Sequence, residues 1–128
     1  MKQQIIGGAL ALADGRVLPL SKAVRAGDFV FLSGQLGLRA DGTLAGTDIE
    51  TQTRQSLENI KAILSEAGCS FAQVIKSTVW LVERSDFARF NQVYAEYYPA
   101  RPPARSTVVS GLVLAGALVE IETLVYAP

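Results

Sequence analysis

Histidine is absent from the 128-residue chain, and cysteine occurs once, at Cys69. Without histidine there is no Ser-His-Asp triad or Cys-His dyad, and the most common zinc and haem ligand is missing. A single cysteine also excludes an internal disulfide bond. Acid–base chemistry must therefore use carboxylates, tyrosine, lysine or backbone groups, and we expect neither a metal nor a cofactor.

Net charge is absent too, because 12 basic residues balance 12 acidic ones. A neutral surface has no electrostatic reason to attract nucleic acid or an anionic membrane. No apolar run approaches the roughly 18 residues of a membrane span, and the first residues lack the flanks and cleavage site of a signal peptide. We expect a cytoplasmic protein that forms one domain over residues 1–128 and binds neither nucleic acid nor membranes.

The first half of the chain predicts a hairpin and a helix. Residues 23–35 are typical of two short strands around the turn Ala26-Gly27-Asp28. Thr47 and Glu50 match a capping box that opens a helix, and Gly68 is a good stop for it. One stripe of this helix is apolar, with Gln52 among the residues outside it: Ile49, Thr53, Leu57, Ile60, Leu64 and Ala67.

The second half predicts three strands and a second helix. Residues 74–82 form an expected strand with Val74, Thr78, Trp80 and Val82 on one face and Ile75, Val79 and Leu81 on the other. Ser85 is expected to cap a helix that ends at Pro99 and carries Phe87, Phe90, Tyr94 and Tyr97. Strands over 102–109 and 117–126 complete the order β-β-α-β-α-β-β, an α+β fold.

Two helices are too few to cover both faces of this sheet. Right-handed crossovers place both helices on the same face. The strand over 117–126 still presents Leu118, Leu124 and Tyr126 to the other face, and 49% of the chain is hydrophobic. A second copy of the chain is the simplest cover, and the alternative is a half-exposed antiparallel sheet.

Two glutamates and an arginine are the candidate chemical groups. Glu120 and Glu122 point to the same uncovered face, where buried carboxylates are costly unless they are paired or functional. They could form a salt bridge at the rim of an interface, or handle water or a proton in a cleft between subunits. Arg105 lies between Pro102-Pro103 and a β-branched run, and could neutralise one glutamate or bind a substrate carboxylate.

Several blocks between residues 20 and 126 resemble the Rid family, also called the YjgF or endoribonuclease L-PSP family. They are "FLSGQL", "TRQSLENIKAILSEAG", "VIKSTVWLVERSDFARFNQVYAEYYP", "PPARSTV" and "VEIETLVY". The resemblance implies a chorismate-mutase-like α+β fold and a homotrimer with a central barrel and clefts between subunits. It also implies hydrolysis of 2-enamine and 2-imino acids, such as 2-aminoacrylate and 2-iminopropanoate, to 2-keto acids and ammonia.

The same resemblance implies roles for single residues. Arg105 would grip the substrate carboxylate, and Glu120 would position the attacking water. Ser33 and Gly34 would line the cleft, although Ser33 has no histidine to activate it as a nucleophile. Asn91 matches the asparagine of the family's second helix, with a binding or structural role.

Two positions depart from the family pattern. Leu20 stands where deaminase-active members often have a tyrosine, which implies a more apolar imine or weaker activity. Thr107 replaces a frequent cysteine, and Cys69 is a helix-end residue to which we assign no redox role. A non-catalytic module that binds small carboxylates or partner proteins is therefore the alternative function. An endoribonuclease is disfavoured by zero net charge and the lack of histidine.

Overall fold

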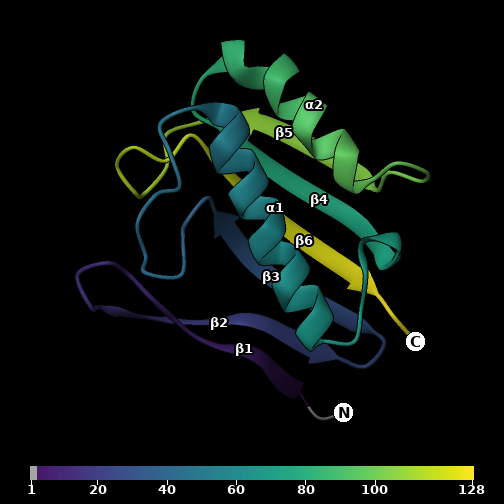
Figure 1. Ribbon diagram of the computed structural model, residues 1–128. Coiled ribbons are helices and arrows are strands. Elements are labelled where there is room, and N and C mark those ends of the chain that lie inside the picture. Colours follow the sequence, from purple (N-terminus) through teal and green to yellow (C-terminus); the bar gives the residue numbers. More distant parts are fainter. Residues whose placement is uncertain (1–2) are drawn as a thin grey trace.

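Six strands form one mixed sheet that carries both helices on a single face (Figure 1). The structure is a computed structural model that describes residues 3–128. The strand order is β1-β2-β3-β6-β4-β5, in which only β4 and β5 are parallel. The elements are β1 (Gln3–Ala11), β2 (Val17–Ala26), β3 (Phe29–Leu36), α1 (Ile49–Glu66), β4 (Val74–Leu81), α2 (Phe87–Tyr97), β5 (Ala104–Val109) and β6 (Val119–Tyr126). The predicted α+β class is confirmed.

The sequence did not predict β1, and it predicted only the end of β2. Gly7 and Gly8 interrupt the alternation of β1 with backbone φ angles of 89° and 64°, which glycine adopts without steric cost. The register of β1 against β2 shifts between Ile6 and Ala9, so the ladder is irregular at this point. The two strands form a long hairpin at one edge of the sheet (Figure 1).

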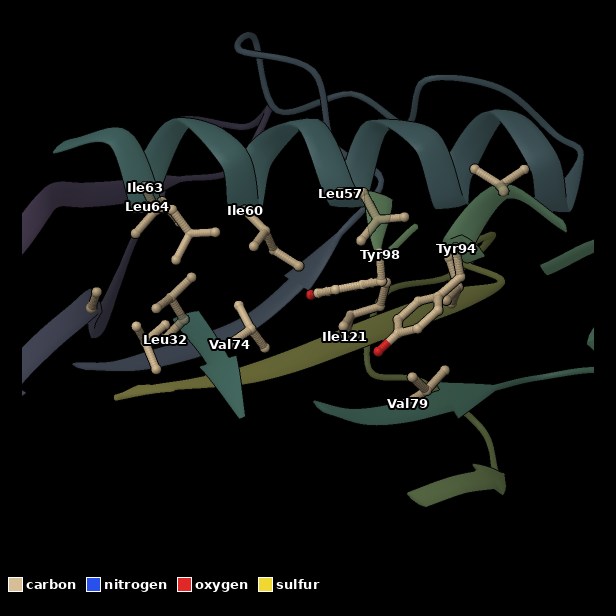
Figure 2. Close-up of a cluster of buried hydrophobic side chains, with 14 of the residues drawn as sticks. Leu32, Leu57, Ile60, Ile63, Leu64, Val74, Val79, Tyr94, Tyr98 and Ile121 are labelled. Carbon is tan, nitrogen blue, oxygen red and sulfur yellow. The ribbon is translucent and has the colours of Figure 1, made fainter. Parts of the chain in front are cut away.

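The predicted apolar stripe of α1 is confirmed. Leu57, Ile60 and Leu64 are buried, and Figure 2 shows them pointing from α1 toward the sheet. The helix begins one residue later than predicted, because the Asp48 carboxylate caps it by accepting the backbone N–H of Thr51 at 2.9 Å and the Thr51 hydroxyl at 2.8 Å. The capping role predicted for Thr47 is therefore wrong.

Gln52 is fully buried, although the sequence placed it outside the apolar stripe. Its amide nitrogen donates to the carbonyl oxygens of Gly46 at 2.9 Å and Gly116 at 3.0 Å. Its side-chain oxygen accepts the backbone N–H of Leu118 at 2.8 Å. The side chain thus fastens two loops to α1, a role that no periodicity indicates.

The second helix also begins differently from the prediction. A 3₁₀ turn over Arg84–Asp86 leads into α2, whose N-cap is Asp86, so Ser85 does not cap it. Phe90 and Tyr94 are buried against the sheet, and the Tyr94 hydroxyl donates to the Ser77 hydroxyl at 2.9 Å. Phe87 stays 44% exposed at the start of α2.

Strand β4 shows one exchange of faces. The predicted alternation put Ile75 on the buried face, which also carries Val79 and Leu81, and put Val74 on the other face. In the structure Val74 is 5% exposed and Ile75 is 42% exposed, so these two residues have changed places. A register shift between Val74 and Lys76 causes this, because it adds a residue before the regular ladder with β6 begins. Figure 2 shows Val74 within the core beneath α1.

The face opposite the helices is apolar and uncovered in the single chain. Phe29, Phe31, Val108 and Tyr126 are between 38% and 50% exposed on it. Cover by a second copy, and the homotrimer, stay predictions. No helix within residues 3–128 combines the length and the hydropathy needed to cross a membrane.

Candidate active site

A cleft opens where β2 and β3 separate. The ladder between them ends at the pair Ala23 and Leu32, and beyond it the strands diverge around a cavity of about 770 Å³. Leu20, Gly34 and Glu120 all line this cavity, so three of the residues singled out from the sequence meet there. Leu20 is 40% exposed at its wall.

A β-bulge brings Gly34 against Glu120. Leu32 pairs with Thr123 and Gln35 with Ile121, so Ser33 and Gly34 together oppose the single residue Glu122. A Cβ atom built on Gly34 would lie 2.5 Å from Oε2 of Glu120. Any larger residue at position 34 would push the Glu120 carboxylate away from β3.

Ser33 lies next to Gly34 but faces a different space. Its hydroxyl donates to the carbonyl oxygen of Ser21 at 2.6 Å. Together with Glu122, it lines a smaller cavity of about 380 Å³. The hydroxyl thus helps to hold β2 beside β3 at the point where the cleft opens.

Glu120 is a half-buried carboxylate, and no hydrogen bond or ion pair to it is found within residues 3–128. Burial raises its pKa above the usual value for glutamate, and the negative charge of Glu122, two residues along the same face, raises it further. A carboxylate of raised pKa that lines a cavity is suited to accepting a proton from water.

Arg105 lies on the edge strand β5, with its side chain against α2. It pairs in register with the buried Ser77 on β4. Its guanidinium carbon lies 4.9 Å from the ring centre of Tyr94, 5.4 Å from that of Phe90 and 5.7 Å from that of Phe87. Such stacking favours a cation and orients its plane.

The N–H donors of the Arg105 guanidinium are unused in the part of the single chain that the structure describes. Its guanidinium makes no hydrogen bond or ion pair to any residue in 3–128, although the stack holds it in place. A planar guanidinium with unused donors is the group that best binds a carboxylate through two parallel hydrogen bonds. The three aromatic rings were predicted only as core, from their helical spacing; the exposure of Phe87 shows that the group reaches the surface.

Thr107 and Asn91 belong to the same side of the molecule as Arg105. Thr107 pairs with the buried Val79, and so shares a face of β5 with Arg105. Asn91 lies four residues after Phe87 and three before Tyr94 on α2, which places it next to both rings. Its Oδ1 atom is buried and has no hydrogen-bond partner in the described part of the chain.

Arg105 and Glu120 lie on opposite faces of the sheet within one chain. Glu120 pairs with Trp80, and its neighbours Val119 and Ile121 are the residues that face the helices. Arg105 shares the helix face instead, so it does not neutralise Glu120 inside the same chain. The chain therefore carries two half-sites: a guanidinium half-site of Arg105, Thr107 and Asn91, and a carboxylate half-site of Glu120, Gly34 and Leu20.

Comparison with known proteins identifies the family. The model of the endoribonuclease L-PSP family matches residues 14–127. A RutC family protein of Pyrococcus horikoshii is 47% identical over 109 residues, which cover 84% of this chain and 86% of that protein. The human 2-iminobutanoate/2-iminopropanoate deaminase is 34% identical over 113 residues, which cover 88% and 82% of the two chains. The crystal structure of E. coli TdcF with bound serine matches with a TM-score of 0.86 at 34% identity, covering 98% of this chain and 99% of that one. The chain is therefore a member of the endoribonuclease L-PSP family, also known as the Rid family, which includes proteins named as deaminases.

Proposed function

We propose that this protein hydrolyses 2-imino acids and their 2-enamine tautomers to 2-keto acids and ammonia, in clefts between copies of the chain. The observation that carries the proposal is the pair of half-sites: a held guanidinium and a half-buried carboxylate of raised pKa, neither of which has a hydrogen-bond or ion-pair partner among residues 3–128. Related proteins support the substrate class, since one is named for imino-acid deamination and another was crystallised with serine, a small amino acid.

Two copies are needed because the half-sites lie on opposite faces of one sheet. The guanidinium half-site is on β5, whose outer edge is unpaired, and the carboxylate half-site is next to β2, toward the other side of the sheet. A head-to-tail contact joins the guanidinium half-site of one copy to the carboxylate half-site of the next. Repeated contacts of this kind can close into a ring. A homotrimer of this kind would also cover the apolar face around Phe31 and Tyr126.

The reaction needs an oriented water more than a covalent nucleophile. The water oxygen attacks C2 of the imine, the C=N π electrons move to nitrogen, and a proton passes from the water to that nitrogen. The resulting carbinolamine then breaks its C–N bond as the hydroxyl oxygen forms C=O and loses its proton. The net change is one imino acid and one water to one 2-keto acid and one ammonia.

The residues of the two half-sites divide this work. Arg105 binds the substrate carboxylate by two charge-assisted hydrogen bonds, which fixes the plane of the neighbouring C=N bond. Glu120 of the adjoining chain accepts a hydrogen bond from the water, takes its proton and returns it to the leaving nitrogen. Because Gly34 has no side chain, the carboxylate can lie flat against β3, where it stays in place during attack.

A coupled assay tests the proposal. A pyridoxal-phosphate serine dehydratase generates 2-aminoacrylate, and the release of pyruvate is followed with and without this protein. We expect acceleration by the wild type and a loss of kcat/KM of at least about 100-fold in Arg105→Ala, because the variant loses two hydrogen bonds to a charged group, each worth about 1.5–3 kcal/mol. Arg89→Ala, an exposed arginine on α2, is the matched control and should keep full activity. No acceleration by the wild type would refute the proposal.

A binding module without catalysis is the second candidate, because Leu20 supplies no hydroxyl to the cleft. In that case the protein would bind pyruvate in a titration and leave the rate of 2-aminoacrylate decay unchanged. Binding lost in Arg105→Ala would then still assign the guanidinium half-site to a carboxylate. A ribonuclease is not proposed, because the chain has zero net charge and no histidine.

A further inference from the structure

The cavity beside Glu120 is much larger than a three-carbon substrate requires. Its volume of about 770 Å³ lies in the range of sites that enclose drug-sized ligands. Leucine dominates its wall, from the β1–β2 hairpin, from β3 and the loop after it, and from the loop before β6: Leu10, Leu12, Leu18, Leu20, Leu36, Leu38 and Leu114. The space that adjoins the reacting group is therefore mainly apolar.

Three polar side chains of the same wall already have hydrogen-bond or ion-pair partners. Arg39 donates to the carbonyl oxygens of Leu44 and Ala45, and Arg16 pairs with Asp14 at 2.7 Å. Asn59 donates to the carbonyl oxygens of Leu36 and Leu38. Lys22 and Glu66 also line the cavity and have no hydrogen bond or ion pair within residues 3–128, so a ligand meets these two charged groups and Glu120 on a wall that is otherwise mainly apolar.

We infer that the preferred substrates are 2-imino acids with a bulky aliphatic or aromatic side chain, which occupies the leucine-lined cavity while Glu120 in its wall handles the water. This inference rests on the proposed function, and narrows its substrate class. The occupant is the side chain of the substrate, because Glu120 lines the cavity and must lie near C2, the carbon that carries that side chain. The carboxylate on the other side of C2 goes to Arg105.

The expected preference follows from burial of apolar carbon. Each additional methylene in a hydrophobic pocket changes kcat/KM by about 10–200-fold when it is fully enclosed. The imine of leucine has three more carbons than the imine of alanine, and the cavity is partly open. We therefore expect kcat/KM to be at least about 10-fold higher for the leucine imine.

Ala62 offers a way to fill the cavity without disturbing the core. It is exposed on α1 and lines the cavity, so Ala62→Trp places an indole inside it. Lys61→Trp adds the same group one residue along the same helix, at an exposed position outside the cavity. Leu20→Gln provides a second variant, because it replaces an exposed apolar wall with a polar one of similar size.

A flavin amino-acid oxidase, with catalase present, generates the two imines in situ from L-leucine and from L-alanine. The experiment measures the release of the 2-keto acid from each imine. Wild type and Lys61→Trp should prefer the leucine imine. Ala62→Trp should lose about 10-fold or more on the leucine imine and change less than about twofold on the alanine imine. Leu20→Gln should lower the ratio of kcat/KM for the leucine imine to kcat/KM for the alanine imine. Circular dichroism verifies that each variant is folded.

Each outcome bears on one of the two proposals. Equal rates for both imines in the wild type, or equal losses on both in Ala62→Trp, would overturn the apolar side-chain site and leave the deaminase intact. Failure of the wild type to accelerate either imine, and 2-aminoacrylate as well, would overturn the proposed function itself.

Discussion

Gly34→Ala is the sharpest single perturbation of the carboxylate half-site. Gly34 does not have a positive φ, so alanine fits its backbone without strain. The added Cβ would lie 2.5 Å from Oε2, 2.9 Å from Cδ and 3.0 Å from Cγ of Glu120. Ordinary contact begins at 3.4 Å, so the carboxylate must retreat by about 0.9 Å.

A displacement of this size is enough to damage catalysis. Misplacing a reacting group by about 1 Å costs on the order of 100-fold in rate, which is about 2.7 kcal/mol of transition-state stabilisation. We therefore expect kcat/KM to fall about 100-fold in Gly34→Ala. The variant should keep its thermal stability, since the glutamate can swing into the cavity.

Steady-state kinetics on 2-aminoacrylate and on the leucine imine measure this effect. Gly111→Ala is the matched control, because its added Cβ meets nothing within 4 Å and its φ is unstrained. In a Glu120→Gln background, Gly34→Ala should cost little more, because the displaced group has already lost its function. Retention of activity within twofold in Gly34→Ala, or an equal loss in both backgrounds, would refute the reasoning.

Two further predictions concern charge and stability. Glu122→Gln removes a neighbouring negative charge and should therefore lower the raised pKa of Glu120. An NMR titration of the Glu120 carboxyl group and the acid limb of the kcat/KM profile should both move to lower pH. An unchanged titration would contradict the coupling between the two glutamates. Gln52→Met removes three hydrogen bonds and should lower the free energy of unfolding by about 3 kcal/mol, at about 1 kcal/mol each, in urea denaturation at fixed protein concentration. A midpoint equal to that of the wild type would show that these bonds do not fasten the loops.

The elements that follow a simple period could be predicted from the sequence. The stripe of α1 and the alternation of β6, with Val119, Ile121 and Val125 inward, match the structure because burial on one face dictates their spacing. β1 was missed because Gly7 and Gly8 break the alternation on which strand prediction depends. The register shift after Val74 changes which side chains face the core. It depends on pairing with the neighbouring strand, so the sequence of β4 alone does not indicate it.

The candidate site residues could be named from the sequence, but their arrangement in space could not. Family resemblance pointed to Arg105 and Glu120, and the structure stacks the first on aromatic rings of α2 and leaves the second half-buried in a cavity wall. Which face Arg105 occupies depends on its parallel register with Ser77, and that register is set by the crossover through α2 rather than by the strand itself. For the same reason the stack on Phe87, Phe90 and Tyr94 was not foreseen.

Mixing of inactive variants tests the central claim most directly, namely that each site takes its arginine and its glutamate from different chains. Chains with Arg105→Ala and chains with Glu120→Gln, inactive alone, are unfolded together and refolded as a 1:1 mixture. Random assembly into a head-to-tail ring should place an intact Arg105 opposite an intact Glu120 at about a quarter of the interfaces, and so restore about a quarter of wild-type activity. A mixture of Arg105→Ala with the double variant should restore none. If the first mixture also stayed inactive while wild type refolded to full activity, the two residues would not share a site across chains, and the account would be wrong.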